Sequence, residues 1–163
     1  MDKIPTQTWH QSFQAFLQPR VINMLFLGFS AGIPLLLIFS SLSLRLREAG
    51  VERAAVTFFS WAALGYSFKF VWAPLIDKLP LPILTQRLGR RRGWILLAQF
   101  LIMAAITGMA LVDPTSGPNS LTLMALAAVA LGFSSATQDI VIDAYRIESA
   151  GPSMQAMMSS GYI

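Results

Sequence analysis

Two carboxylates interrupt an otherwise apolar segment of the sequence, SSATQDIVIDAYRIE at residues 134–148. Asp139 and Asp143 are four residues apart, a spacing that places both side chains on one face of a helix. Ionisable groups that face lipid are energetically unfavourable, so within a membrane they usually face a helix-bundle interior or a water-filled cavity. In such a cavity, burial raises and a nearby cation lowers the pKa of a carboxyl group, so a change in either can drive proton uptake or release. The two acids therefore have the chemistry that proton-coupled transport requires.

We expect different surroundings for Asp139 and Asp143. Asp139 lies seven residues before Arg146, about 10 Å inside the helix end, and its short side chain cannot reach the membrane surface. Further hydrogen-bonding side chains lie at the same depth: Ser134, Ser135, Thr137 and Gln138. We predict that Asp139 borders a polar cavity. For Asp143, a helix-end ion pair with Arg146 is favoured over a second acid in that cavity.

A cation is expected at the same depth on another helix. Lys69 lies eight residues before Asp77, and Asp139 lies seven residues before Arg146, so both side chains are about 10 Å inside the same end of their helices. A pair of Lys69 and Asp139, direct or through a water or substrate, is compatible with this common depth, and the sequence leaves their contact open; alternatively, the long stem of Lys69 extends to the lipid head groups. Tyr66, on the same face, is a candidate stacking surface for a sugar, although aromatic residues in membrane helices more often serve packing or interfacial anchoring.

The composition is that of a membrane protein. Of 163 residues, 55% are apolar and 12% are charged, whereas soluble domains carry about a quarter charged residues. Cysteine is absent and His10 is the single histidine, so the sequence predicts neither a metal centre nor a cofactor. The formal charge of +4 comes from basic residues between apolar runs, where they set membrane topology rather than bind nucleic acid.

Four apolar stretches position these residues, and we predict an all-α, polytopic transmembrane helix bundle embedded in the lipid bilayer. The expected helices cover residues 21–44, 54–76, 94–112 and 121–145, and a fifth begins near 153. At about 1.5 Å per residue, the first is longer than the roughly 30 Å hydrocarbon core. Gly28 and Gly32 form a GxxxG pattern, which favours close helix packing, and Pro34 is expected to loosen the backbone.

The distribution of basic residues predicts the orientation. The loop 77–93 contains five of them: Lys78, Arg87, Arg90, Arg91 and Arg92. The turn DPTSGP between the third and fourth helices contains none. Because Lys and Arg accumulate in cytoplasmic loops, we predict that the loop 77–93 and the N-terminus are cytoplasmic. The three arginines of the segment 45–53 are a weaker signal of the opposite sense.

Three stretches carry a family resemblance, SFKFVWAPLIDKLPLP, LGRRRGW and SSATQDIVIDAYRIE, together with LGFSAGIPLLL in the first helix. From about Arg20 onward, the chain closely resembles the AmpG muropeptide permeases of the major facilitator superfamily. Eukaryotic acetyl-CoA transporters share part of the pattern, and the compact loops favour the bacterial permeases. The resemblance implies a proton-driven importer of GlcNAc-anhydroMurNAc peptides in the bacterial inner membrane, with roles in cell-wall recycling and β-lactamase induction.

The resemblance also implies a conformational latch between the second and third helices. Five residues match the superfamily motif G-x-x-x-D-[RK]-x-G-[RK]-[RK]: Asp77, Lys78, Gly89, Arg90 and Arg91. The segment LPLPILTQRL lengthens the middle of the motif, and Ala73 replaces its first glycine. The usual role of the motif, an ion-pair latch of the outward-facing state, is expected for Asp77, with Arg90 and Arg91 as candidate partners.

The same resemblance completes the expected transport site. Asp139 is the expected proton-responsive group, with Asp143 one turn away. Lys69 is its partner or a ligand for the carboxylates of the peptide substrate. Gln138 and Tyr66 are the expected sugar contacts.

Members of this superfamily have two six-helix halves that rock about a midplane site. Since the sequence supplies four helices and the start of a fifth, we expect a missing C-terminal part to complete the transporter. One alternative is an inert or accessory membrane fragment that needs a separate remainder to transport. Another is a membrane enzyme acting on lipid-linked sugars with the carboxylates as acid and base. This enzyme class is disfavoured, because the sequence offers no metal site and no nucleophile beside a base.

Overall fold

The computed structural model of the chain describes residues 14, 16–51, 61, 64–149, 151, 155 and 158–160. The regular elements among these residues are all helices, which confirms the predicted all-α fold. Three described helices are long and apolar enough to cross a membrane: Pro19–Glu48, Arg90–Leu111 and Pro118–Ser149. The expected helix 54–76 lies partly outside the described residues, as does most of the segment that begins near 153.

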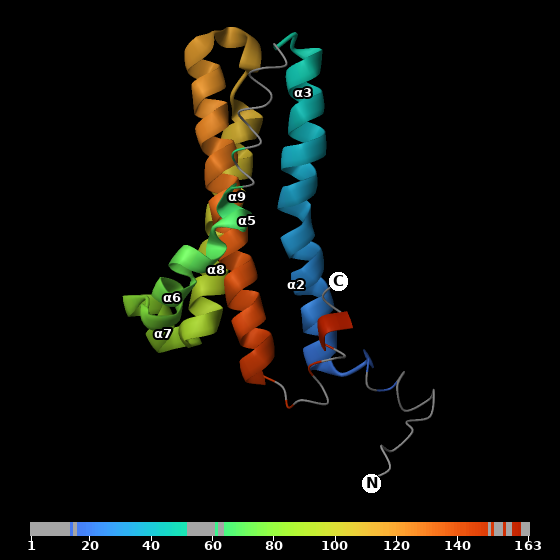
Figure 1. Cartoon of the computed structure of the whole chain (residues 1–163), viewed down its shortest axis with the longest axis vertical. Coiled ribbons are helices and arrows are strands. Elements are labelled where there is room, and N and C mark those ends of the chain that lie inside the picture. The colour runs from blue at the N-terminus through green and yellow to red at the C-terminus, as the bar shows by residue number, and fades with distance from the viewer. Residues whose placement is uncertain are drawn as a thin grey trace. The chain divides into compact units, whose positions relative to one another are not determined.

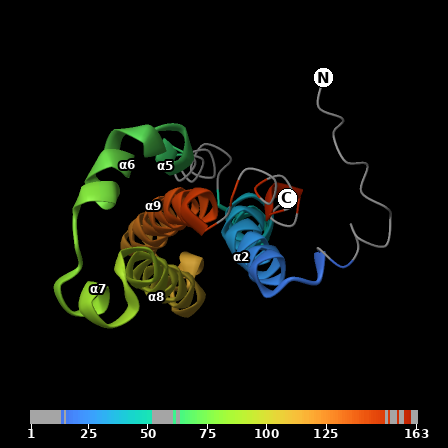
Figure 2. The same cartoon turned by 90° about the horizontal axis from the view of Figure 1, so that it is seen from below.

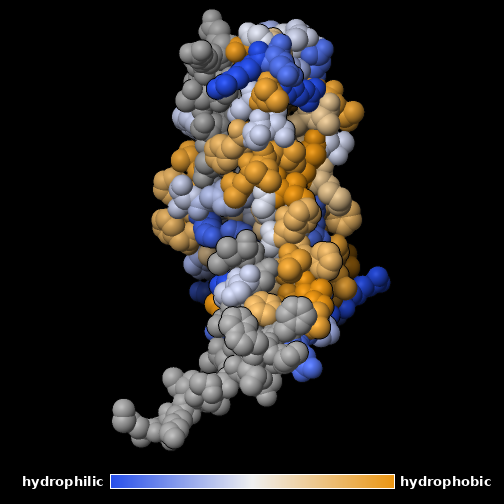
Figure 3. All heavy atoms as spheres, turned by 90° about the vertical axis from the view of Figure 1, so that its right-hand side faces the viewer, coloured by the Kyte–Doolittle hydropathy of each residue, from blue (hydrophilic) through white to orange (hydrophobic). Residues whose placement is uncertain are grey.

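The first long helix changes its winding beyond its proline. It consists of α2 (Pro19–Leu36), the π-helical segment η1 (Leu37–Leu42) and α3 (Ser43–Glu48). Pro34 has no backbone N–H to donate, and a π-turn close behind it is one way in which a helix absorbs such a disturbance. The face of the molecule that includes η1 and α3 is largely hydrophobic, with hydrophilic side chains gathered at its upper end (Figure 3).

The next described segment is broken where a continuous helix was expected. Helix α5 (Leu64–Ser67) and helix α6 (Lys69–Lys78) are separated by Phe68, whose φ of −102° and ψ of 9° lie outside the helical range. Two backbone hydrogen bonds span this break. The Phe68 amide donates to the Leu64 carbonyl at 3.0 Å, and the Val71 amide donates to the Phe68 carbonyl at 2.9 Å. Because α6 begins directly after Phe68, Lys69 occupies its first position.

The basic segment expected as a loop contains a helix, α7 (Pro82–Leu88). Pro82 occupies its first turn, where its fixed φ suits a helix start, and Gly89 ends it with a φ of 83°. Helix α8 (Arg90–Leu111) follows at once. A Cβ added at Gly93 would lie 3.1 Å from the Leu84 Cβ, so glycine allows α7 to pack tightly on α8.

A polar turn joins α8 to α9 (Pro118–Ser149). It contains one 3₁₀ turn, η3 (Pro114–Ser116). The carboxylate of Asp113 accepts hydrogen bonds from the Thr115 amide and hydroxyl, at 2.9 and 2.7 Å, and thereby fixes the start of that turn. The two long helices are antiparallel and side by side (Figure 1).

The described chain divides into two compact units, Ala31–Ala144 being the larger. Its main core lies between η1, α3, α8 and α9 and is formed by the following buried residues: Ile38, Leu42, Leu46, Ile102, Ala105, Met109, Met124, Ala128 and Leu131. A smaller cluster joins Ile76 of α6 to Ile140 and Val141 of α9. Within this unit, α5 and α6 lie beside α9, and α7 lies beside α8 (Figure 2).

The second unit comprises Met1–Ser30 and Tyr145–Ile163. Among its described residues, Val21, Met24 and Met158 are buried. The Arg20 guanidinium donates a hydrogen bond of 2.9 Å to the carbonyl oxygen of Ser149. This bond ties the start of α2 to the end of α9.

Candidate functional site

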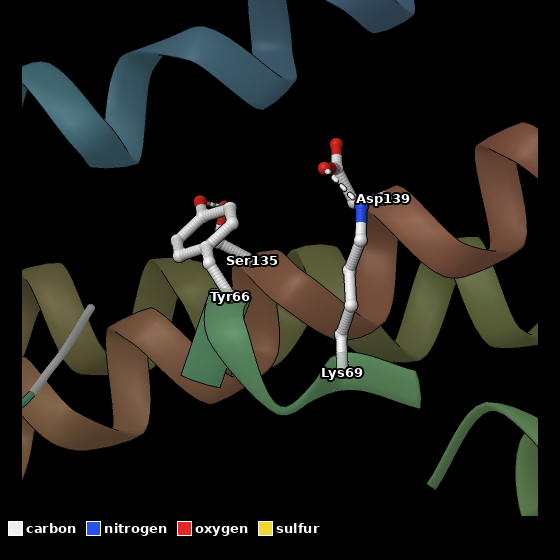
Figure 4. Close-up of polar contacts among 4 residues, drawn as sticks. All are labelled: Tyr66, Lys69, Ser135 and Asp139. Atoms are coloured by element: carbon white, nitrogen blue, oxygen red, sulfur yellow. Dashed lines mark hydrogen bonds and ion pairs between the residues drawn. The ribbon is translucent and has the colours of Figure 1, made fainter. Parts of the chain in front are cut away.

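The structure shows the contact between Lys69 and Asp139 that the sequence left open. The Lys69 Nζ lies 3.4 Å from the Asp139 Oδ2, and the extended Lys69 side chain reaches from α6 to the carboxylate on α9 (Figure 4). The Lys69 side chain is 38% exposed and that of Asp139 is 20% exposed. The two charges are thus held together at a partly accessible position within an apolar stretch of chain.

The break at Phe68 determines how Lys69 meets its partner. As the first residue of α6, Lys69 places a positive charge where the helix macrodipole is already positive. The carboxylate of Asp139 offsets this unfavourable position. The site thus consists of an ammonium group held by a carboxylate at a partly accessible position.

A second polar contact lies one turn away from the ion pair. The Tyr66 hydroxyl donates a hydrogen bond to the Ser135 Oγ, and both side chains point toward each other between α5 and α9 (Figure 4). Tyr66 is half-buried and Ser135 is buried. Tyr66 and Lys69 thus contact residues one helical turn apart on α9, and both segments advance in the same direction, as expected for parallel spans.

Aromatic packing fixes the register of α6 on α9. The Trp72 ring stacks on Phe133 with a centroid separation of 4.9 Å, and its Nε1 donates a hydrogen bond of 3.3 Å to the Thr137 Oγ1. At the other end of this contact, α5 comes so close to α9 that a Cβ on Gly65 would lie 3.0 Å from the Gly132 carbonyl. These contacts hold the ion pair from both sides.

The structure separates the remaining predicted site residues. Gln138 is fully buried, with an exposed fraction of 0%, so its side chain does not reach an accessible surface in this conformation. Asp143 is half-buried one turn beyond Asp139. Of the predicted sugar contacts, Tyr66 therefore lies next to the ion pair and is partly accessible, and Gln138 is enclosed.

The predicted latch residues also form an ion pair. The Arg91 Nη1 lies 2.6 Å from the Asp77 Oδ1, which joins the last turn of α6 to the first turn of α8. Arg91 is 13% exposed and Asp77 is 48% exposed. Arg90, the other candidate, is exposed at the start of α8. The geometry thus assigns the contact with Asp77 to Arg91.

Sequence analysis placed Ser135 and Thr137 at the depth of Asp139 without assigning their partners, and it did not single out Trp72. The three-residue spacing of Tyr66, Lys69 and Trp72, which puts them on one helix face, is the signal that was available for Trp72. Among the residues that the structure describes, no group of three His, Cys, Asp or Glu side chains is arranged to hold a metal ion.

Comparison with known proteins identifies relatives of the chain. The family model described as acetyl-coenzyme A transporter 1 matches residues 21–160. Putative transporter AmpG 4 of Rickettsia felis is 37% identical over 145 residues, which cover 89% of this chain and 34% of the relative. The anhydromuropeptide permease of Escherichia coli K12 is 38% identical over 138 residues, which cover 85% of this chain and 27% of the permease. The chain thus spans about a third or less of the length of these relatives. No solved structure is significantly similar.

Proposed function

We propose a function for this chain from its family, because it belongs to the transporters described as acetyl-coenzyme A transporter 1 and is a relative of the AmpG permeases. The resemblance seen in its motifs is thereby confirmed, and its class is that of a transporter rather than an enzyme. The proposed function is to form part of a permease that imports GlcNAc-anhydroMurNAc peptides together with protons. The Escherichia coli relative is an anhydromuropeptide permease, which supports this substrate class.

The contact between Lys69 and Asp139 is the observation that carries the proposed coupling. The Asp139 Oδ2 lies 3.4 Å from the Lys69 Nζ, so in the proposed cycle an ionised Asp139 holds Lys69 before substrate binds. Protonation of Asp139 removes its charge, and the freed ammonium of Lys69 then binds a carboxylate of the muropeptide. The charge of Lys69 favours the ionised form of Asp139. A substrate carboxylate that binds Lys69 neutralises this charge and so favours protonation of Asp139. Substrate binding and proton binding thus support each other.

The neighbouring residues have proposed supporting roles. Tyr66, held by Ser135, offers an aromatic face to a sugar ring beside the ion pair. Gln138 contacts the sugar only in a conformation that opens the contact between α6 and α9. Asp143 is a second proton site further along the same helix. The pair of Asp77 and Arg91 stabilises one of the two transport conformations, with Arg90 beside it.

The proposed setting is the inner membrane of a bacterium, with the N-terminus in the cytoplasm. Imported anhydromuropeptides would supply cell-wall recycling and would feed β-lactamase induction. Because the chain is shorter than its curated relatives, a complete permease is the suitable test system.

The test replaces the matching part of the Escherichia coli permease by this chain, in a strain that lacks its own anhydromuropeptide uptake. We expect the chimera to import labelled anhydromuropeptide and to stop when a protonophore collapses the proton gradient. Asp139→Asn and Lys69→Met should each lower the uptake rate by roughly tenfold or more, equivalent to about 1.4 kcal/mol. Arg87→Gln, an exposed charge of α7, is the control and should leave uptake unchanged.

Membrane levels of each variant are measured by immunoblot, so that loss of protein is separated from loss of transport. If both site variants import at the wild-type rate, the coupling proposal is wrong. If the chimera is present in the membrane but imports nothing, the substrate proposal is wrong. The chain expressed alone tests the alternative of an accessory fragment, which predicts uptake only when the remainder is supplied.

A further inference from the structure

Arg45 of α3 closes the end of α8. Its Nη1 donates a hydrogen bond of 2.7 Å to the carbonyl oxygen of Met109, and its Nη2 donates one of 3.0 Å to that of Val112. The last carbonyl groups of a helix have no partner within the helix, and they carry its negative partial charge. The guanidinium therefore satisfies this helix end and is fixed there. A guanidinium has five N–H donors, so it retains donors for a further acceptor.

A cavity of about 140 Å³, open on one side, lies next to this guanidinium. Apolar side chains of η1 and α8 form most of its lining, among them Leu37, Ile106 and Ala110. Its polar members are Ser41 and Arg45. A cavity of this size and polarity accommodates a small apolar group rather than water.

The cavity lies at the level where two apolar helices end. Helix α3 ends at Glu48 and α8 ends at Leu111, just before the polar turn that begins at Asp113. In a bilayer, this transition from apolar helix to polar turn marks the head-group level. An apolar cavity there, with a fixed cation at its rim, has the layout of a lipid site, since basic pockets between membrane helices bind phospholipid head groups.

A negative charge accompanies the cation. Asp113 directly follows Val112, whose carbonyl oxygen is bound by Arg45. Hydrogen bonds from Thr115, and next to them the positive charge of Arg45, hold the pKa of the Asp113 carboxyl below its usual value. A phosphate beside Arg45 would therefore meet an ionised carboxylate close by. That carboxylate disfavours an anionic head group and favours one that carries an ammonium.

We propose that the cavity between η1 and α8 binds one phospholipid with a primary-amine head group. A short segment of an acyl chain fills the cavity, the phosphate accepts hydrogen bonds from Arg45, and the ammonium donates to Asp113. A phosphatidylglycerol lacks the ammonium, and a phosphatidylcholine has a quaternary amine without N–H donors. The site thus distinguishes head groups by two opposite charges and not by net charge alone.

Native mass spectrometry of the delipidated chain tests this site with three lipids of identical acyl chains: phosphatidylethanolamine, phosphatidylglycerol and phosphatidylcholine. We expect phosphatidylethanolamine to be retained with roughly tenfold higher affinity than the other two, the effect of one charge-assisted contact. Asp113→Asn keeps an oxygen acceptor for the turn and should remove that preference without weakening phosphatidylglycerol. Arg45→Gln should weaken all three lipids. Arg47→Gln, an exposed arginine of the same helix, is the matched control and should change nothing.

Because Arg45→Gln also uncaps α8, a second variant leaves the guanidinium in place. Ala110→Phe fills the cavity from its rim and should lower the retention of all three lipids, with helix content by circular dichroism unchanged. Equal retention of the three lipids in the wild type would overturn the head-group assignment. Retention that is unaffected by Ala110→Phe in a folded chain would show that the cavity is not the lipid site.

Discussion

At the level of single residues, three charges of the candidate site stand at helix ends that disfavour them. Lys69 begins α6, Asp77 lies in the last turn of α6, and Arg91 lies in the first turn of α8. Each position opposes the macrodipole, at a cost of about 0.3–1 kcal/mol. Each charge is offset by a partner of opposite sign, Asp139 for Lys69 and Arg91 for Asp77. Part of each pair's attraction is thus used to offset the dipole, which leaves contacts that a modest free energy can exchange.

Asp113 gives a pH prediction at the same scale, in a turn outside the apolar spans. Hydrogen bonds from the Thr115 amide and hydroxyl, and then the charge of Arg45, lower its pKa in the folded chain. A carboxyl with a lowered folded-state pKa contributes stability above its unfolded value of about 3.9, and that contribution disappears as the pH falls through the folded value. We expect Asp113→Ala to unfold at a lower temperature than the wild type at pH 7.

The difference between the two melting temperatures should shrink steadily below about pH 4, because the Asp113 carboxyl then becomes protonated in the unfolded chain and, at lower pH, in the folded chain as well. Thermal unfolding of the detergent-solubilised chain, followed by circular dichroism from pH 7 to acid, measures it. Asn119→Ala, at the nearby start of α9, is the control and should show no such pH dependence. A difference that stays constant or grows toward acid would mean that hydrogen bonding to the ionised carboxylate does not stabilise the turn.

At the level of elements, the contact between α5 and α9 depends on a glycine. A Cβ on Gly65 would lie 3.0 Å from both the carbonyl carbon and the carbonyl oxygen of Gly132, and backbone atoms cannot turn aside. Gly65→Ala should therefore push α5 from α9 and loosen the bond between Tyr66 and Ser135. We expect a loss of about 1–3 kcal/mol in the free energy of unfolding, typical of overpacking.

Gly32 provides the matched control. An added Cβ there would meet nothing within 4 Å in the described structure, so the close packing expected from the GxxxG pattern is not found at this position. Gly32→Ala should raise stability by about 0.5–1 kcal/mol, since alanine is the better residue in a helix interior. Chemical unfolding in detergent compares the two variants. Equal effects would show that the backbone contact at Gly65 is not tight in solution.

The sequence indicated the common depth of Lys69 and Asp139 but neither their contact nor its surroundings. The two residues are eight and seven residues from a charged helix boundary, so their similar depth could be read along the chain. Phe68 offers no such signal, because neither glycine nor proline marks the break, and Pro74 lies inside α6 without ending it. The neighbours Gln138 and Asp139 differ in burial because successive side chains of a helix point about 100° apart, and only the packed structure shows which one is enclosed.

The same limit applies to the segment expected as the loop 77–93. Its charges predicted an exposed polar segment, but Pro82 and Gly89 are also a helix start and a helix end, and the residues between them form α7. The contact of α7 with α8 depends on Gly93 and Leu84, which belong to different elements. Contacts between elements, such as this one, had to be seen in three dimensions.

At the level of the whole molecule, the orientation in the membrane remains a prediction with a physical basis. Helix α8 has 22 residues, about 33 Å at 1.5 Å per residue, so its basic start and the polar turn after it must lie on opposite sides of a bilayer. Five basic residues lie in the segment 77–93, three of them in the first turn of α8, and each Lys or Arg near the anionic cytoplasmic surface gains about 1 kcal/mol. The turn after α8 has none. The segment 77–93 should therefore be cytoplasmic.

The absence of cysteine allows a direct measurement of this orientation. Gln86→Cys places a single thiol on the exposed side of α7, and Ser116→Cys places one in the turn after α8. In intact cells with a permeabilised outer membrane, a membrane-impermeant maleimide should label the thiol at 116 and not the one at 86. Both should react once the inner membrane is opened, which controls for accessibility. Labelling of the thiol at 86 alone in intact cells would show that the orientation is the opposite one. The five positive charges would then have to be held outside by contacts stronger than the few kcal/mol that the membrane surface offers them.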